Sequence, residues 1–202
     1  MFSRRNLMIG CLATMTGTLL AAQTSSAKQM SMKEVFFDKD APVTGNPKGR
    51  ITVVEYFDYQ CPYCKSSHDM VKKVVASEGD VRLVLKDWPI FGGASIFAAQ
   101  AVLGAAQIGQ YETAMEALMK TKGRLSEGDV EKTLTGAGLS MQEIAASVNR
   151  NNSKISGLLD RNYGQALGFN FVGTPSFVIG TTIYPGVLDE KGLKDAIKCA
   201  RT

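Results

Sequence analysis

The chain of 202 residues is poor in the residues that build zinc sites and disulfide frameworks, with one histidine and four cysteines. A structural zinc site needs four ligands, usually in two pairs, and this sequence offers few candidates. Four cysteines are also too few for a framework of disulfides that would stabilise a chain of this length. With 45% hydrophobic and 21% charged residues, the composition excludes a mainly disordered chain and favours one domain with a core.

The charge of the chain is nearly balanced, since 23 basic and 19 acidic residues give a formal net charge of +4. Arg4 and Arg5 lie in a leader that contains no acid, so the excess in the remainder is smaller still. The other basic residues are mixed with acids, unlike the concentrated basic face of a nucleic-acid-binding protein. We therefore expect no nucleic acid among the partners.

Residues 1–27 are typical of an export signal peptide. Arg4 and Arg5 precede an uncharged apolar run over residues 7–22, and small residues at 25–27 suit a cleavage site. The run is shorter than the roughly 20 apolar residues that a transmembrane helix needs. The paired arginines resemble a twin-arginine signal, so that export route stays open. We expect a periplasmic protein, in a compartment where disulfide chemistry is done.

Residues 28–48 form a polar N-terminal lead-in. Pro42 and Gly45 interrupt this segment and argue against a domain of its own. Within it, the apolar residues 35–37 predict a short edge strand. The main domain is then expected to cover residues 49–202.

The main domain begins with a predicted β-α-β unit. β-branched and aromatic residues over 50–57 predict a buried strand, and an apolar stripe predicts a helix that runs to about residue 77 and stops before Gly79. A second strand is expected over 81–88. Trp88 at its end, like Phe97 further on and Phe91 between them, is expected in the core rather than on a peptide-binding surface.

A helical block follows, over about residues 92–168. Five segments in it show apolar spacing near the helical period: 94–108, 110–122, 126–134, 140–150 and 153–167. Two short strands are then predicted at 176–179 and 182–184, and a final helix from about 189 to 200. The order predicts an α/β fold with an all-helical insertion.

Cys61 and Cys64 lie three positions apart where the first strand is predicted to give way to a helix. A thiol at a helix N-terminus has a lowered pKa, because the N–H groups and the helix dipole favour the thiolate. The second thiol lies one helical turn further on, close enough to form a disulfide. We predict that Cys61 is the nucleophile and Cys64 the resolving thiol, with Pro62 rigidifying the turn.

Metal binding is the alternative for this pair. Beyond it, the chain after the leader offers only His68 and Cys199 as further imidazole or thiol ligands. Cys61, Cys64 and His68 share one helix face and together suit Cu(I). In the competing interpretation His68 is a polar residue on an exposed helix face. We expect no metal and no cofactor, and we expect Cys199 to be a half-buried, inert thiol, with intermolecular pairing as the alternative.

Two segments together resemble a known family. They are YFDYQCPYC at 56–64 and VGTPSFVIG at 172–180, and they resemble the thioredoxin-fold proteins of the disulfide bond protein A (DsbA) type. The subgroup they resemble most is suppressor of copper sensitivity protein C. The resemblance covers about residues 35–199 and implies a thioredoxin fold with an inserted helical subdomain. The sequence departs from DsbA at Tyr63, where DsbA has a histidine.

The resemblance also implies roles for single residues. It implies that Pro175 is cis and faces the cysteine pair, which leaves the Thr174 backbone free to pair with a substrate strand. Glu55 stands where the family keeps a buried acid beneath the second cysteine, and such a carboxyl could relay a proton to or from Cys64. The alternatives are an ordinary turn proline at 175 and a solvated strand face for Glu55.

The predicted function is a thiol:disulfide oxidoreductase that forms or exchanges disulfides in exported proteins with cysteines. We expect Pro62, Tyr63 and Thr174 to contact these substrates, and a membrane redox partner to reset the pair. The direction, oxidase or isomerase/reductase, stays open.

We expect a monomer, because residues 28–48 are too few for the N-terminal oligomerisation module of such isomerases. A Cu(I)-binding copper-tolerance protein is the second class, and a glutaredoxin, against which the leader and the insertion argue, is the third.

Overall fold

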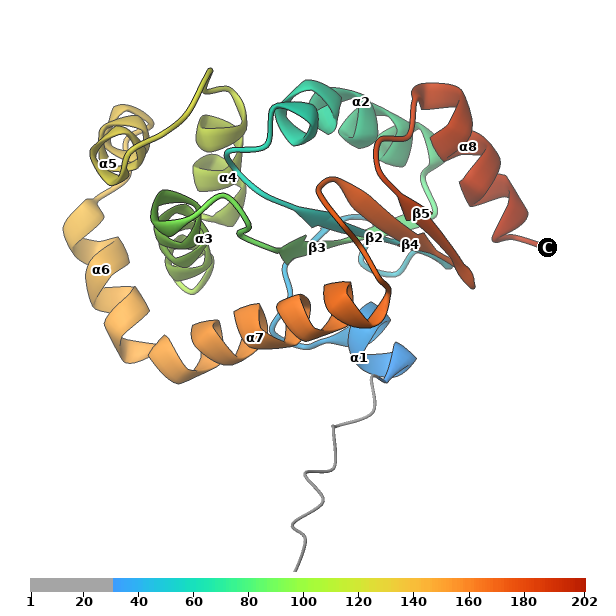
Figure 1. Ribbon diagram of the computed structural model, residues 1–202, viewed down its shortest axis with the longest axis horizontal. Helices are drawn as coiled ribbons and strands as arrows, with labels where there is room; N and C mark the ends of the chain where they lie inside the picture. Colours follow the sequence, from blue (N-terminus) through green and yellow to red (C-terminus); the bar gives the residue numbers. More distant parts are fainter. Residues whose placement is uncertain (1–30) are drawn as a thin grey trace, which may run out of the picture.

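A five-stranded sheet organises residues 31–202, which the computed structural model describes (Figure 1). The strands lie in the order β1-β3-β2-β4-β5. Their bounds are β1 Val43–Gly45, β2 Ile51–Phe57, β3 Val81–Asp87, β4 Ser176–Ile179 and β5 Thr182–Pro185. Only β2 and β3 pair in parallel among these strands, and the other three pairs are antiparallel. The predicted signal peptide, with its export route, lies outside the described residues.

Helices cover both faces of the sheet (Figure 1). One face carries α2 (Pro62–Glu78) and α8 (Glu190–Cys199), and the other carries α1 (Met32–Phe37) and α7 (Asn152–Gly168). Alternate residues of β2 therefore enter different cores. Val53 and Phe57 pack with residues of α2 and α8, whereas Val54 and Tyr56 pack with residues of α1 and α7. Within residues 31–202, no helix has the length and apolar character to cross a membrane.

The predicted helical block is confirmed between β3 and β4. Before α7 it contains α3 Gly93–Ala106, α4 Tyr111–Met119, α5 Glu127–Gly136 and α6 Met141–Arg150. The central helix is α3, which packs against α4, α5, α6 and α7. Its Gly104 lies so close to α6 that a side chain there would collide with Val148. The close crossing of α3 and α6 therefore requires glycine at this position.

Two features of the lead-in differ from expectation. The predicted edge strand at 35–37 is wrong, because these residues are helical and the backbone N–H of Val35 donates to the Ser31 carbonyl. Three consecutive apolar residues fit a short helix as well as a strand. The strand of this segment is β1, which pairs with β3. At Gly45 φ is +70° and a Cβ would lie 2.6 Å from a Val75 methyl, so glycine allows the strand to approach.

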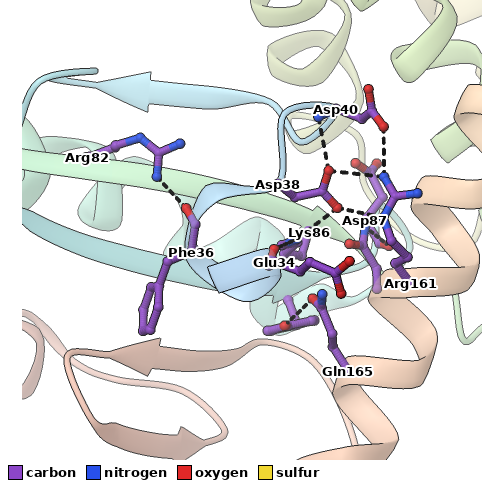
Figure 2. A network of polar contacts seen from close by, with 11 residues as sticks. Glu34, Phe36, Asp38, Asp40, Arg82, Lys86, Asp87, Arg161 and Gln165 are labelled. Atoms are coloured by element: carbon purple, nitrogen blue, oxygen red, sulfur yellow. Dashed lines mark hydrogen bonds and ion pairs between the residues drawn. The ribbon is translucent and has the colours of Figure 1, made fainter. Parts of the chain in front are cut away.

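A polar network joins the lead-in to β3 and α7 (Figure 2). The Asp38 carboxylate accepts hydrogen bonds from Arg161 at 2.8 and 3.0 Å, and Asp40 accepts another at 2.9 Å. Lys86 of β3 is 0% exposed, and its Nζ lies 3.8 Å from Asp38. A buried ammonium needs such a counter-ion. The network therefore holds the N-terminal segment, the sheet and α7 together.

Candidate active site

The cysteine pair lies just beyond the carboxyl end of β2. Cys61 is the N-cap residue of α2, and Pro62 is the first residue of that helix. Both cysteines are buried and both thiols are free. The predicted strand-to-helix junction is therefore confirmed, and the first cysteine stands where the unpaired N–H groups of the helix point.

Asp58 shapes the turn before the pair. Its Oδ1 accepts hydrogen bonds from Gln60 N at 2.7 Å and from the Ser95 hydroxyl at 2.8 Å, and its Oδ2 accepts one from Ile90 N at 2.7 Å. These donors belong to the cysteine turn, to α3 and to the loop after β3. One carboxylate thus fixes several segments around Cys61. The sequence analysis missed this residue, although an aspartate directly after a strand is a common turn signal.

Thr174 and Pro175 approach the pair from the loop before β4. The peptide bond between them is cis, and the Cys61 thiol, when protonated, donates to the Thr174 carbonyl at 3.1 Å. The Thr174 hydroxyl is buried and has no hydrogen-bond partner among the described residues in that form, so it is free to donate to the Cys61 thiolate. The structure therefore brings together the two segments that the sequence resemblance paired, although they lie 113 positions apart.

The two thiols have opposite pKa shifts. A hydrogen bond from Cys64 lowers the pKa of Cys61 to about 6 despite burial, and the Thr174 hydroxyl and the backbone N–H groups of Cys64 and Tyr63 contribute further. Burial raises the pKa of Cys64, and the hydrogen bond to Cys61 adds to the rise. At neutral pH the first sulfur is therefore a thiolate and the second a thiol.

Glu55 lies on β2, on the sheet face that α2 covers, and is 3% exposed. Burial raises its pKa to about 8, with a contribution from the charge of Cys61. Its own charge helps to raise the pKa of Cys64. The alternative of a solvated strand face is therefore wrong. A carboxyl of this kind is mostly protonated at neutral pH and can give or take a proton.

A cavity of about 160 Å³ between α2, α4 and β1 reaches Glu55. His68 and Glu116 line it, together with apolar residues of α2 and β3. His68 is only 6% exposed, and its Nε2 lies 2.9 Å from Glu116 Oε1. The expectation of an exposed helix face for His68 is wrong, because α4 of the insertion packs over this part of α2.

His68 also belongs to the one group that could hold a metal ion within residues 31–202. It comprises His68, Asp69 and Glu116, whose candidate ligand atoms lie within 4.8 Å of one another, and it contains neither cysteine of the pair. Glu116 is already in an ion pair with Lys72. The described residues therefore do not assemble the set of two cysteines and His68 considered for Cu(I). Cys199, expected to be half-buried, is exposed at the end of α8.

Apolar side chains surround the pair at the surface. Tyr63 is 63% and Val172 96% exposed, and Phe91 is exposed as well. Trp88 is buried and Phe97 packs against the core, as expected, but the core position expected for Phe91 is wrong. These side chains give the surface beside the pair an apolar rim.

Comparisons with known proteins agree with this fold. A family model described as Thioredoxin matches residues 38–199. A solved thioredoxin-like oxidoreductase from Silicibacter pomeroyi DSS-3 is 37% identical, with 85% of this chain and 98% of that one covered and a TM-score of 0.81. The predicted fold class, α/β with the helical insertion, is confirmed.

Two further solved structures are similar. The catalytic domain of Proteus mirabilis ScsC is 25% identical, with 84% of this chain and 93% of that one covered and a TM-score of 0.71. The thiol-disulfide exchange protein alpha-DsbA2 from Wolbachia pipientis is 24% identical, with 82% and 90% covered and a TM-score of 0.76. At that identity the second likeness concerns the fold.

The chain also matches parts of longer curated proteins. It is 25% identical over 162 residues to the Na(+)/H(+) antiporter NhaA 1 of Mycobacterium sp. (strain KMS), which is 79% of this chain. It is 23% identical over 160 residues, 78% of this chain, to NhaA 3 of Salinispora tropica. The chain spans about a quarter of their length, 26% and 24% respectively. Their names therefore describe proteins of which this chain resembles one portion.

Proposed function

We propose a function for this chain, which belongs to the thioredoxin family and to its DsbA-like group. It is a periplasmic thiol:disulfide oxidoreductase that acts on exported proteins with reactive cysteines. The observation that carries the proposal is the arrangement of Cys61 at the start of α2, where Cys64 donates to it and the loop of Thr174 faces it. A thiolate beside a protonated second thiol is the pair that disulfide exchange needs. The location rests on the signal-like leader and on the chemistry.

In the oxidising direction a substrate thiolate attacks the Cys61 sulfur of the Cys61–Cys64 disulfide. The bond between the two cysteines breaks, a mixed disulfide forms with Cys61, and Cys64 leaves as a thiolate that takes up a proton. A second substrate thiolate then attacks the substrate sulfur of the mixed disulfide and expels Cys61. The substrate loses two electrons, which remain in the reduced pair until a membrane redox partner removes them.

In the opposite direction the Cys61 thiolate attacks a substrate disulfide, and Cys64 must lose its proton before it can resolve the mixed disulfide. We assign this proton to the carboxylate form of Glu55, whose share increases as the pH approaches 8. Glu55 is buried with a pKa of about 8, its charge acts on Cys64, and the small cavity beside it offers a path to water. A carboxyl with a pKa near the working pH suits general acid–base transfer in either direction.

Substrate contacts are proposed on the rim of the pair. The backbone of Thr174, next to Pro175, faces Cys61 and is the group to which an extended substrate can add as a strand. Pro62 and Tyr63 are exposed on the other side. Apolar substrate side chains would meet this rim, which suits unfolded chains.

The roles of the two cysteines can be tested by trapping. In a Cys199→Ser background, which removes the exposed third thiol, Cys64→Ser should accumulate mixed disulfides with other exported proteins, because attack survives and resolution does not. Cys61→Ser should trap few or none. Non-reducing gels of cell extracts give the readout, and equal trapping by both variants would contradict the assignment.

The direction of exchange needs a separate experiment. We favour an oxidase over an isomerase or reductase, acting as a monomer. The redox state of Cys61 and Cys64 in the intact cell discriminates between them, since an oxidase is held mostly as the disulfide and an isomerase mostly as the dithiol. Alkylation of acid-quenched cells followed by mass measurement gives that ratio.

A further inference from the structure

A groove of about 720 Å³ opens beside the cysteine pair. Gln60 and Pro62, the two neighbours of Cys61 in the chain, line one side of it. The segment from Met119 to Arg124, which connects α4 to α5, lines the other side, and Phe91 adds an apolar surface. A polypeptide joined to Cys61 therefore has this groove directly beside its point of attachment.

The charges along the groove are mostly of one sign. The lining contains one carboxylate, Asp69, and four cationic side chains, Lys65, Lys120, Lys122 and Arg124, of which Lys120 lies 3.8 Å from Glu116. Lys122 and Arg124 are exposed and form no ion pair with any residue in the described part of the chain. Since the whole chain of 202 residues carries a net charge of only +4, this is a local concentration of positive charge.

Two hydrogen bonds hold the cationic segment against the cysteine turn. Gln60 Oε1 accepts from the backbone N–H of Leu125 at 2.9 Å, and Lys65 Nζ donates to the Gly123 carbonyl at 3.3 Å. The amide nitrogen of Gln60 in turn donates to the Ser95 hydroxyl at 3.1 Å. The cations thus keep a defined place relative to Cys61, and a ligand that binds them does not have to order the loop first.

We propose that this groove binds an acidic segment next to the reactive cysteine of a polypeptide client. The inference rests on the proposed function and adds a charge preference to it. Carboxylates of aspartate and glutamate form charge-assisted hydrogen bonds with lysine and arginine, and the volume accommodates several residues rather than a single ion. Rim charges of this kind act mainly on the rate of encounter, and salt screens their effect.

The test uses two synthetic peptides that each contain one disulfide. They are identical except for the four residues beside one cysteine, which are Asp and Glu in the first peptide and Lys in the second. Exchange with the reduced full-length protein is followed at low and at 0.5 M salt. The double variant Lys122→Glu/Arg124→Glu is compared with Lys33→Glu/Lys198→Glu, which changes the net charge equally at exposed positions that do not line the groove. Bis(2-hydroxyethyl) disulfide, a neutral linear disulfide, reports the intrinsic reactivity of the pair.

The wild-type protein should react with the acidic peptide about fivefold or more faster than with the lysine peptide at low salt, and the ratio should fall at high salt. The groove variant should lose or reverse the preference, whereas the control variant should keep most of it. A wild-type ratio near one, or equal loss in both double variants, would overturn the groove proposal. Failure to exchange with every disulfide, bis(2-hydroxyethyl) disulfide included, would instead overturn the proposed function.

Discussion

Glu55 and Lys86 are both buried in the central strands, on opposite faces of the same sheet. Glu55 is opposite Leu85 in the register of β2 and β3, and Lys86 follows Leu85 with its side chain on the other face. Lys86 has the carboxylate of Asp38 at 3.8 Å, whereas no cation pairs with Glu55 in the described residues. Burial shifts both pKa values to about 8, upward for Glu55 and downward for Lys86, where Asp38 opposes the shift.

The difference shows how the fold treats buried charge in two ways. Around Lys86 the carboxylate of Asp38 compensates the charge, and Arg161 binds the same carboxylate, so the protonation of Lys86 is tied to structure (Figure 2). Around Glu55 nothing compensates the charge, and the carboxyl can change its protonation as the cysteines react. The first arrangement serves stability and the second serves chemistry.

The largest loss of stability from a single substitution is expected when the ion pair of Lys86 is broken. Asp38→Ala removes the nearest carboxylate from the buried Lys86 ammonium and leaves only the weaker effect of Glu34, so we expect the free energy of unfolding to fall by about 3 kcal/mol or more. Urea denaturation measures this loss. Asp40→Ala, which removes the less buried partner of Arg161, should cost less. Thiol exchange by the folded Asp38→Ala protein should remain normal, and a loss below about 1 kcal/mol would contradict the account of this network.

Glu55→Gln should slow disulfide exchange rather than lower the free energy of unfolding. Without the carboxyl, resolution of the mixed disulfide by Cys64 should slow by about 100-fold near neutral pH, in the range of general acid–base catalysis. Single-turnover exchange against pH is the readout, and the wild-type dependence with a midpoint near 8 should disappear. Glu112→Gln, at the same cavity, is the matched control and should leave the rate unchanged. A rate loss with an unaltered pH profile would reduce Glu55 to a structural role.

The stability of the oxidised protein should fall as pH rises toward 8. Burial raises the pKa of Glu55 to about 8 and that of Asp87 to about 7, so the folded state keeps protons that the unfolded state has lost above about pH 4. For Glu55 burial is the larger cause, and it persists when the disulfide removes the Cys61 charge. Each group then lowers the unfolding free energy by about 1.4 kcal/mol per pH unit until its folded pKa is reached. Urea denaturation from pH 5 to 9 measures this, and Glu55→Gln should flatten the profile. An unchanged slope in that variant would count against the buried carboxyl.

The last of these predictions concerns reduction of the cysteine pair. The pKa of Cys61 is lowered to about 6, so between pH 6 and about 8.5 the folded state holds a thiolate and the unfolded state a thiol. Fewer bound protons in the folded state mean that stability rises with pH in this window. The unfolding free energy of the reduced protein should therefore increase relative to the oxidised protein by up to about 1.4 kcal/mol per pH unit. Cys61→Ser should show no such rise.

Local patterns made most of the fold predictable. The β-α-β unit and the helices of the insertion follow from apolar periodicity, and Gly79, with a φ of +67°, ends α2 where expected. The lead-in was harder, because β1 depends on its pairing with β3 and on the space that Gly45 leaves beside Val75. Such pairings are not visible in a three-residue segment.

The parts of the candidate site that lie in recognisable sequence motifs could be predicted. The cysteine pair and Thr174–Pro175 were found in that way, although they lie far apart in the chain. His68 was misjudged, because its partner Glu116 lies 48 positions away on a helix whose docking the sequence does not reveal. The cationic groove was missed for the same reason, since Arg124 and Lys65 meet only in the folded chain.

The pKa of Cys61 tests the central claim most directly. The measurement is the rate of alkylation against pH in the reduced Cys199→Ser protein, with each modified cysteine identified by mass. We expect Cys61 to react with a midpoint near pH 6 while Cys64 stays unmodified through neutral pH. A Cys61 midpoint near the ordinary thiol value of about 8.5, or equal reactivity of the two cysteines, would contradict a nucleophile activated at the start of α2.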